Sequence, residues 1–392
     1  MRLGERRTRM NVILEARHGE DGLSVRWRDQ GESHYPWFWL RDHGEDAASL
    51  DPETLQRRVD TFALPDDIRA SASAILDDGR TLEVRWPDAP EPSRYSADFL
   101  ARLAGHAPPE QVPAPGVARR LWSAQSPLAP PPPLSHDAVV ETEVGLRACL
   151  ERLHTFGFAV IEGVPTDEAA ARRLLTRFGY IRETIFGGVW RLSAELKEHG
   201  DTAYSTSALE PHTDATYCRD APGLQSFLCL EFDGEGGESV LVDGFALAEA
   251  LRRDDPESFQ TLTEVQVPGR YIEPGVFLWA ERPAIRLNGA GEVEQISFNN
   301  YDRAPFILPP QDMAAFYRAY RALHGRIVAR ANWLTLPLRP GMALIMDNWR
   351  VLHGRNGYLG TRVFCGCYHN REDFESALRT KMAAPTTGRT EP

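Results

Sequence analysis

Lysine is nearly absent from this chain of 392 residues: only Lys197 and Lys381 occur, and arginine supplies the other basic side chains. Basic residues number 44 against 56 acidic ones, which leaves a formal net charge of −12 at pH 7. A chain of this sign does not favour binding to nucleic acid or to an anionic membrane surface. We therefore expect neither nucleic acid nor a membrane as a partner.

Long apolar runs are also lacking. No stretch approaches the roughly 20 apolar residues that a helix needs to cross a bilayer. The first ten residues, "MRLGERRTRM", are basic but carry no apolar segment, so they do not fit a signal peptide. We expect a cytoplasmic protein of the bacterial type, without a signal peptide or a transmembrane segment.

Cysteine is scarce, and its distribution argues against a disulfide framework. The five cysteines are Cys149, Cys218, Cys229, Cys365 and Cys367. Their odd number and scattered positions favour reduced thiols. Cys365 and Cys367 lie two apart in "VFCGCY", which is too close for one zinc ion to use both comfortably. We interpret this pair as core residues of a strand.

What the sequence does contain divides into three regions. Residues 11–105 alternate apolar and polar side chains in "LSVRWRD" and "TLEVRWPD", which predicts a small β-rich domain. Residues 106–136 are rich in proline ("HAPPEQVPAPG", "SPLAPPPPLSHD") and predict an extended linker. Residues 137–385 begin with two helical patterns and continue with short apolar segments such as "LQSFLCLEF" and "SVLVDGF". Short strands with helices outside them predict a mainly β fold, a jelly roll or a barrel.

The segment "LEPHTDATY" places His212 and Asp214 two residues apart, just before a predicted strand. In an extended chain two such side chains point to the same side. His353, which follows an apolar, strand-like segment, supplies a third ligand. Two imidazoles and one carboxylate suit Fe(II) and occupy one face of the ion, leaving positions for substrate and oxygen. We expect these three residues to be the metal ligands and the catalytic centre.

An arginine strengthens this interpretation. Arg362 follows His353 by nine residues. A keto-acid co-substrate chelated to iron needs its far carboxylate held, and a guanidinium does so through paired, charge-assisted hydrogen bonds. Ser239, in "GGES", is either a second hydroxyl donor to that carboxylate or a turn residue, and the sequence favours neither.

Several further segments carry a family resemblance that runs over nearly the whole chain. In order they are "YPWFWLRDHG", "VRWPD", "RETIFGGVW", "DTAY", "PHTDATY", "GGESVLVDGF", "FNNYDRA", "DNWRVLHGR" and "GTRVFCGCY". They resemble the Fe(II)- and 2-oxoglutarate-dependent dioxygenases of carnitine biosynthesis, the trimethyllysine and γ-butyrobetaine dioxygenases of the TauD-like superfamily. The resemblance implies a double-stranded β-helix catalytic domain with flanking helices behind a small N-terminal β-rich domain. It also implies that His212, Asp214 and His353 bind iron and that Arg362 binds 2-oxoglutarate. The other small molecules that the resemblance implies are O2 as a substrate and ascorbate as an activator. The resemblance further implies a homodimer.

The resemblance also implies a substrate pocket. In this family a quaternary ammonium lies among aromatic rings, whose negative faces attract the cation. The positions that resemble this cage are Phe186, Trp190, Tyr204 and Tyr368. Asp201 of "DTAY" and Asn299 of "FNNYDRA" resemble the residues that meet the amino-acid end of the substrate. A carboxylate at position 201 suits an α-ammonium, so the resemblance implies hydroxylation of Nε-trimethyllysine to 3-hydroxy-trimethyllysine.

One departure concerns zinc. Relatives in this family carry cysteines after "LRD" that bind a structural zinc together with a histidine, whereas this chain reads "LRDHGEDAASL". Without cysteine a thiolate zinc site is not available. We predict no zinc, a hydrogen-bonded or surface role for His43, and a first domain held by its aromatic core.

Other interpretations stay open. The alternative substrates are γ-butyrobetaine, a betaine phosphonate and another free amino acid of a specialised pathway, because a family resemblance does not determine which substrate an enzyme accepts. The chain is alternatively a metal-binding structural or sensor protein without turnover, or a metal-independent β-sandwich binding module. Arg362 weighs against a structural metal site, because such a site needs no anchor for a keto acid.

Overall fold

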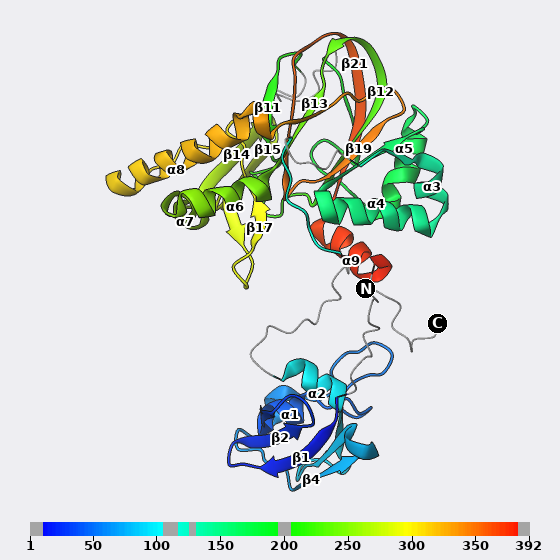
Figure 1. Cartoon of the computed structure of the whole chain (residues 1–392), viewed down its shortest axis with the longest axis vertical. Helices are drawn as coiled ribbons and strands as arrows, with labels where there is room; N and C mark the ends of the chain where they lie inside the picture. The colour runs from blue at the N-terminus through cyan, green and yellow to red at the C-terminus, as the bar shows by residue number, and fades with distance from the viewer. Residues whose placement is uncertain (1–10, 105–116, 125–130, 195–204, 383–392) are drawn as a thin grey trace, which may run out of the picture. The chain divides into compact units, whose positions relative to one another are not determined.

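A computed structural model describes residues 11–104, 117–124, 131–194 and 205–382 (Figure 1). The chain divides into two compact units, the first ending at Val112 and the second beginning at Pro113. Much of the predicted linker, and the predicted site residues Asp201 and Tyr204, lie outside the described residues.

The first unit confirms the predicted β-rich domain. Its described part holds antiparallel sheets of order β1-β2-β3 and β4-β5-β6. The strands and helices are β1 (Ile13–His18), β2 (Gly22–Trp27), β3 (Glu32–Pro36), α1 (Trp37–Asp42), β4 (Ala72–Leu76), β5 (Thr81–Arg85), β6 (Ser93–Ser96) and α2 (Ala97–Leu103). Aromatic side chains fill the space between them: Trp27, Tyr35, Trp37, Trp86 and Tyr95 are all buried in one core.

His43, the residue near the expected zinc position, is hydrogen-bonded. Its Nδ1 donates to the carbonyl oxygen of Trp39 at 2.8 Å, and its ring stacks on the Trp39 ring with centroids 4.7 Å apart. The neighbouring carboxylate of Asp42 is buried and accepts hydrogen bonds from Arg57 and Thr61. The polar groups around His43 and Asp42 thus form hydrogen bonds within the first unit. The absence of zinc stays a prediction.

The second unit is a jelly roll, as predicted. In the larger sheet the strand order is β10-β21-β12-β19-β8-β7, with β9 beside β21, and in the smaller sheet it is β11-β20-β13-β18. The larger sheet contains β7 (Leu134–Ser135), β8 (Phe158–Glu162), β9 (Ile181–Arg182), β10 (Val189–Leu192), β12 (Leu224–Gly236), β19 (Ala343–Asp347) and β21 (Tyr358–His369). The smaller sheet contains β11 (Leu209–His212), β13 (Ser239–Asp243), β18 (Leu334–Leu336) and β20 (Val351–Arg355).

Helices cover the outside of both sheets (Figure 1). The core of the larger sheet packs against α3 (His136–Glu141), α4 (Glu143–Phe156), α5 (Glu168–Leu175) and α9 (Arg371–Met382). The core of the smaller sheet packs against α6 (Gly244–Asp254), α7 (Pro256–Glu264), α8 (Pro310–Val328), β16 (Ile285–Leu287) and β17 (Val293–Ile296). A hairpin of β14 (Val267–Glu273) and β15 (Val276–Arg282) lies before β16. None of the described helices is both long enough and apolar enough to cross a lipid bilayer.

Between the two sheets lies a third apolar core, and it includes part of the predicted linker. Phe158, Leu344 and Phe364 of the larger sheet meet Leu241 and Val351 from the smaller one. Trp122, within the proline-rich region, is buried in the same cluster. Its indole Nε1 donates to the carbonyl oxygen of Phe156 at 2.6 Å. Residues 117–124 therefore pack as part of the second unit, a placement that proline content alone does not indicate.

A buried ion pair fixes the turn that carries the chain from β19 in the larger sheet to β20 in the smaller one. Arg350 is 1% exposed, and its Nε and Nη2 donate to the carboxylate of Asp243 at 3.1 and 2.8 Å. Its remaining donors reach the carbonyl oxygens of Arg120, His154 and Thr155. One guanidinium thus ties the linker region, the end of α4 and both sheets together, three residues before His353.

We predict that Arg350→Met destabilises the second unit by roughly 3–5 kcal/mol, because Asp243 is left as a buried charge without its partner. Urea denaturation followed by near-ultraviolet circular dichroism measures the change. The double variant Asp243→Asn/Arg350→Met removes both charges and should recover part of the loss. Equal stability of the single and double variants would show that the uncompensated charge is not the cause.

Candidate active site

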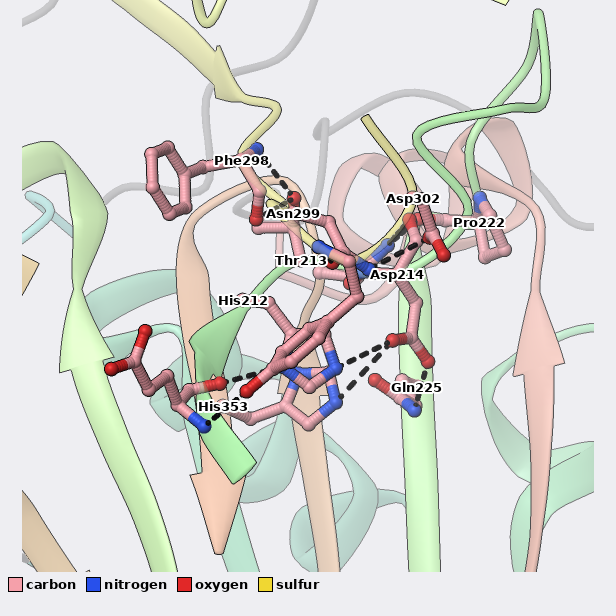
Figure 2. Close-up of polar contacts among 12 residues, drawn as sticks. His212, Thr213, Asp214, Pro222, Gln225, Phe298, Asn299, Asp302 and His353 are labelled. Carbon is pink, nitrogen blue, oxygen red and sulfur yellow. Dashed lines mark hydrogen bonds and ion pairs between the residues drawn. The ribbon is translucent and has the colours of Figure 1, made fainter. Parts of the chain in front are cut away.

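The two histidines of the predicted triad face each other across a strand pair. His212 ends β11 and lies directly opposite His353 of β20, with ring centroids 4.7 Å apart. Asp214 follows two residues later, and its Oδ1 lies 3.3 Å from His212 Nε2 and 3.6 Å from His353 Nε2. Figure 2 shows the three side chains converging. The structure therefore brings together all three residues that the sequence singles out.

One hydrogen bond determines which nitrogen of His212 is available to a metal. Its Nδ1 lies 2.8 Å from the carbonyl oxygen of Glu210. Because a carbonyl oxygen can only accept, Nδ1 carries a proton, and Nε2 is the nitrogen that faces Asp214 and that can bind a metal once it has lost its own proton. Metal-binding histidines commonly donate their other ring N–H in this way, which fixes the orientation of the ring.

The second oxygen of Asp214 is held by another cross-strand pair. Gln225 of β12 and Tyr368 of β21 lie opposite each other. The Gln225 amide donates to Asp214 Oδ2 at 2.5 Å (Figure 2). The Tyr368 hydroxyl donates to the same oxygen at 2.7 Å. With Oδ2 occupied, Oδ1 is left facing the imidazoles. The carboxylate can therefore bind a metal through one oxygen without rotating.

The backbone of Asp214 is fixed as firmly as its side chain. Asn348 is buried, and its amide accepts from Asp214 N at 2.8 Å and donates to Asp214 O at 3.2 Å. On the preceding residue, Thr213 N donates to Phe298 O at 2.9 Å, and Thr213 Oγ1 accepts from Phe298 N at 3.0 Å. Ala215 then takes a φ of +58°, a left-handed conformation that is strained for alanine. Strain of this kind persists only where the surroundings enforce it, and it gathers at functional sites.

Burial and mutual attraction shift the three pKa values in different directions. Burial opposes the charged form of His212, but the hydrogen bond and negative charge of Asp214 outweigh it and raise its pKa. Burial opposes ionisation of Asp214, but the two imidazoles and the Tyr368 hydroxyl outweigh it and lower its pKa. For His353, burial prevails and lowers the pKa to about 4. Asp214 is thus ionised and His353 neutral near pH 7, the states in which each binds a metal.

The donor set fits a divalent transition metal. The three ligand atoms all lie within 4.8 Å of one another. Cys365 and Cys367, on the strand that carries Tyr368, are buried in the helix-side core and are free thiols, as predicted. Two imidazoles and one carboxylate, without a thiolate, are typical of non-haem Fe(II) sites that keep positions open for substrate and oxygen.

Arg362 lines the same cavity and offers a binding group for an anion. It is 8% exposed, and its guanidinium lies 3.9 Å from the centroid of the Phe364 ring. Among the described residues its Nε has no hydrogen-bond partner, and no acid pairs with it. Burial, together with the positive charge of Arg355, lowers its pKa to about 10, so it stays charged at pH 7. A buried, charged guanidinium of this kind fits the carboxylate of a keto acid.

Ser239 also lines the cavity, at the start of β13. It is buried and lies opposite Arg355 in the pairing of β13 with β20. This placement is compatible with the predicted hydroxyl donor to the co-substrate, and that role stays a prediction.

Of the residues predicted for the aromatic cage, Phe186, Trp190 and Tyr368 line the cavity, and Tyr204 lies outside the described residues. Trp190 of β10 lies opposite Gly366 of β21. A Cβ at position 366 would lie 2.3 Å from the indole ring, so the missing side chain lets Trp190 lie against the strand. The Trp190 and Tyr368 ring centroids are then 5.7 Å apart. Two aromatic rings thus line the cavity together with the Asp214 carboxylate.

Asn299 lies in the loop after β17, is buried, and lines the cavity. Its amide is engaged within its own loop. Nδ2 donates to Asp302 Oδ2 at 2.7 Å, and Oδ1 accepts from Tyr301 N at 2.9 Å (Figure 2). Asp201, the other residue predicted for the amino-acid end of the substrate, lies outside the described residues.

Sequence reasoning missed three polar residues of this site: Gln225, Asn348 and Asp302. A signal existed for two of them. Gln225 is the one amide in the apolar segment "LQSFLCLEF", and Asn348 interrupts the apolar segment before His353. A buried polar residue in an apolar strand requires a partner, which here is Asp214. The sequence alone does not say which partner it meets.

Comparison with known proteins finds relatives over nearly the whole length of this chain. Residues 127–368 match the family model "Taurine catabolism dioxygenase TauD, TfdA family", and residues 14–101 match "Gamma-butyrobetaine hydroxylase-like, N-terminal". The chain is 35% identical to trimethyllysine dioxygenase, mitochondrial, of Gallus gallus, over 92% of this chain and 86% of the relative. It is 33% identical to gamma-butyrobetaine dioxygenase of Pseudomonas sp. (strain AK-1), over 94% of this chain and 96% of the relative. A crystal structure of asparagine oxygenase has 16% identity and a TM-score of 0.45, covering 58% of this chain and 78% of that one.

We predict that Gln225→Leu weakens Fe(II) binding about 10- to 100-fold, the usual cost of losing a group that orients a metal ligand. Anaerobic titration with Fe(II), followed calorimetrically, measures the affinity. Ser226→Ala is the matched control, since Ser226 is the next residue of the same buried strand and lies opposite the core residue Cys367. An unchanged affinity in Gln225→Leu would mean that Asp214 needs no support from this amide.

Proposed function

Because the chain belongs to the TauD, TfdA family of dioxygenases, within its group of trimethyllysine and γ-butyrobetaine dioxygenases, we propose that it hydroxylates Nε-trimethyllysine to 3-hydroxy-trimethyllysine. Enzymes of this family are non-haem iron dioxygenases that use 2-oxoglutarate as co-substrate. The observation that carries the proposal is one cavity lined by the His212, Asp214 and His353 triad, by the buried guanidinium of Arg362 and by aromatic rings.

Fe(II) would be held by Nε2 of His212, Oδ1 of Asp214 and His353. When bound with 2-oxoglutarate and O2, the metal supplies the chemistry that puts one oxygen atom into a C–H bond, while 2-oxoglutarate is converted to succinate and CO2. The triad lines the cavity together with Arg362 and the aromatic rings, so other lining groups are available to the co-substrate and the substrate. Ascorbate, as an activator, would keep the metal reduced.

Arg362 would bind the far carboxylate of 2-oxoglutarate through paired N–H donors, with Ser239 as a second donor. Binding there satisfies the Nε group that has no partner among the described residues. The charge of the guanidinium is compensated in the same step. This pairing places the keto acid in a fixed orientation toward the triad.

Apolar side chains would exclude water from the reacting C–H bond. Leu192, Phe227, Leu344 and Met346 line the cavity together with the aromatic rings. The quaternary ammonium of the substrate cannot donate a hydrogen bond, and the faces of Phe186, Trp190 and Tyr368 attract it through their quadrupoles. Holding the cation by its methyl groups leaves the aliphatic chain to reach the metal, which is the positioning that C–H hydroxylation requires.

γ-Butyrobetaine is the second candidate substrate, favoured by the similarity to the Pseudomonas enzyme over nearly the whole of both chains. It shares the trimethylammonium group and the carboxylate with trimethyllysine but lacks the α-ammonium. The aromatic rings of the cavity serve both compounds equally. Discrimination between them depends on a group that recognises the α-ammonium.

We predict that the purified protein, supplied with Fe(II), ascorbate, O2 and 2-oxoglutarate, forms succinate in step with a trimethyllysine product heavier by one oxygen atom. Succinate by nuclear magnetic resonance and product by mass spectrometry measure the coupling, with γ-butyrobetaine assayed in parallel. Coupling to γ-butyrobetaine alone would reverse the order of the two substrates. Succinate formation that neither compound accelerates would exclude both.

A further inference from the structure

One arginine of the second unit is buried outside the cavity. Arg282 ends β15, is 8% exposed, and is not among the residues that line the cavity of the metal triad. Its Nη2 is buried without a hydrogen-bond partner, and among the described residues no carboxylate forms an ion pair with its guanidinium. A guanidinium stays charged at neutral pH, and a buried charge without a counter-charge is costly. Each buried group of this kind needs an explanation, and a bound ion is one.

Two nearby arginines, in contrast, each have an acid. Arg182 of β9 donates to the Asp220 carboxylate at 2.9 Å and to the Asp220 backbone oxygen at 2.8 Å. Arg286 of β16, whose charge acts on Arg282, pairs with Glu294 at 3.0 Å. Of these three guanidiniums, only that of Arg282 lacks a carboxylate among the described residues. Its positive charge is therefore the one that an anion from solution would balance.

The acidic groups that act on Arg282 do not supply the counter-charge. Burial lowers the pKa of Arg282, and neither Cys218 nor Asp220 offsets this effect. The Cys218 thiol is neutral near pH 7, because burial raises its pKa despite the charges of Arg182 and Arg282. Asp220 is already engaged by Arg182. The positive charge of Arg282 thus lies in surroundings that favour the binding of an anion.

The shape of the guanidinium and its burial define the class of anion. Its parallel N–H donors match the two oxygens of a planar carboxylate, whereas a spherical chloride ion cannot accept such a pair of bonds. Because Arg282 is almost completely buried, only a small part of its donor edge can be reached, and the anion is therefore small. Formate and bicarbonate combine the planar geometry, the single negative charge and the size that this position requires.

The position of Arg282 connects the hairpin of β14 and β15 with the loop that carries Cys218. Cys218 packs in one apolar cluster with Tyr217, which lines the cavity. A Cβ at Gly269 of β14 would lie 2.6 Å from the backbone of Thr216, so the hairpin and this loop are in close contact. An anion bound to Arg282, whose charge acts on Cys218, would lie at this contact. It would stabilise the packing of the two segments by balancing the unpaired charge.

We propose that Arg282 binds a small carboxylate-type anion, of the size of formate or bicarbonate, at a site separate from the metal centre, and that this anion stabilises the second unit as the missing counter-charge. The inference is independent of which substrate the enzyme hydroxylates. An anion that binds the folded chain alone raises its stability as the anion concentration rises. Without the anion, replacing the buried charge by an apolar side chain of similar volume should cost little stability or even increase it.

The test measures thermal unfolding of the full chain by near-ultraviolet circular dichroism, in sodium formate and in sodium chloride of equal concentration. For the wild type, the midpoint in formate should exceed that in chloride by about 2–4 °C at about a tenfold excess over Kd. Arg282→Met should show no such difference, and its midpoint in chloride should equal or exceed that of the wild type. Arg286→Met removes a guanidinium that already has an acid, and Arg362→Met removes the one assigned to the co-substrate. Both variants should keep the formate effect.

A second measurement does not rely on stability. The carbon-13 line width of labelled formate is recorded at a temperature where every variant is folded. The line should broaden in the presence of Arg362→Met and stay narrow in the presence of the double variant Arg282→Met/Arg362→Met. Broadening by both proteins would place the bound formate elsewhere on the chain and contradict the inference.

Three results of the unfolding experiment would also overturn the inference. Equal midpoints of the wild type in formate and in chloride would exclude a carboxylate site. A formate effect that persists in Arg282→Met and disappears in Arg362→Met would place the anion in the cavity of the metal triad. A midpoint of Arg282→Met far below that of the wild type in chloride would show that the guanidinium already has a partner, such as bound water. None of these results bears on the proposed hydroxylation, which product analysis tests separately.

Discussion

The carboxylate of Asp214 is the group on which the geometry of this cavity depends. One of its oxygens faces two imidazoles, and the other accepts from an amide and a phenol. Each of these contacts comes from a cross-strand pair, His212 with His353 and Gln225 with Tyr368. A shift of one residue in either pairing would turn these side chains to the other face of the sheet. The buried ion pair of Arg350 with Asp243, in the turn between β19 and β20, holds the two sheets in the positions that make both pairings meet at Asp214.

The candidate metal- and co-substrate-binding residues could be predicted from the sequence, and the residues that orient them could not. His212 and Asp214 could be identified because a spacing of two is a local property of an extended chain. His353 could be identified as a histidine that follows an apolar, strand-like segment, and Arg362 as an arginine nine residues further on. Gln225 and Asn348 act on Asp214 across pairings of distant segments, and no local pattern encodes such a register. Likewise the burial of Trp122 in the second unit depends on a contact with the end of α4, which the proline content around it does not reveal.

The charges of the cavity are distributed in a way that suits a zwitterionic, cationic substrate. Arg362 and Arg355 supply positive charge for the anionic co-substrate. Asp302 adds a negative charge from the loop that is bound to β14. Ring faces around Trp190 attract a cation that cannot donate a hydrogen bond. In the proposed complex, each ligand group would meet a chemically different wall of the cavity, and electrostatics would orient the substrate.

The most direct test of this account is the visible charge-transfer absorption that a keto acid gives when it chelates Fe(II), measured without oxygen. The account predicts that the band appears when 2-oxoglutarate is added to the iron-loaded wild type, saturates at one equivalent per chain, and is lost in Asp214→Ala. A wild-type protein that binds iron without developing the band would contradict the assignment of the cavity to Fe(II) and 2-oxoglutarate. A band of equal strength in Asp214→Ala would contradict the central place given to that carboxylate.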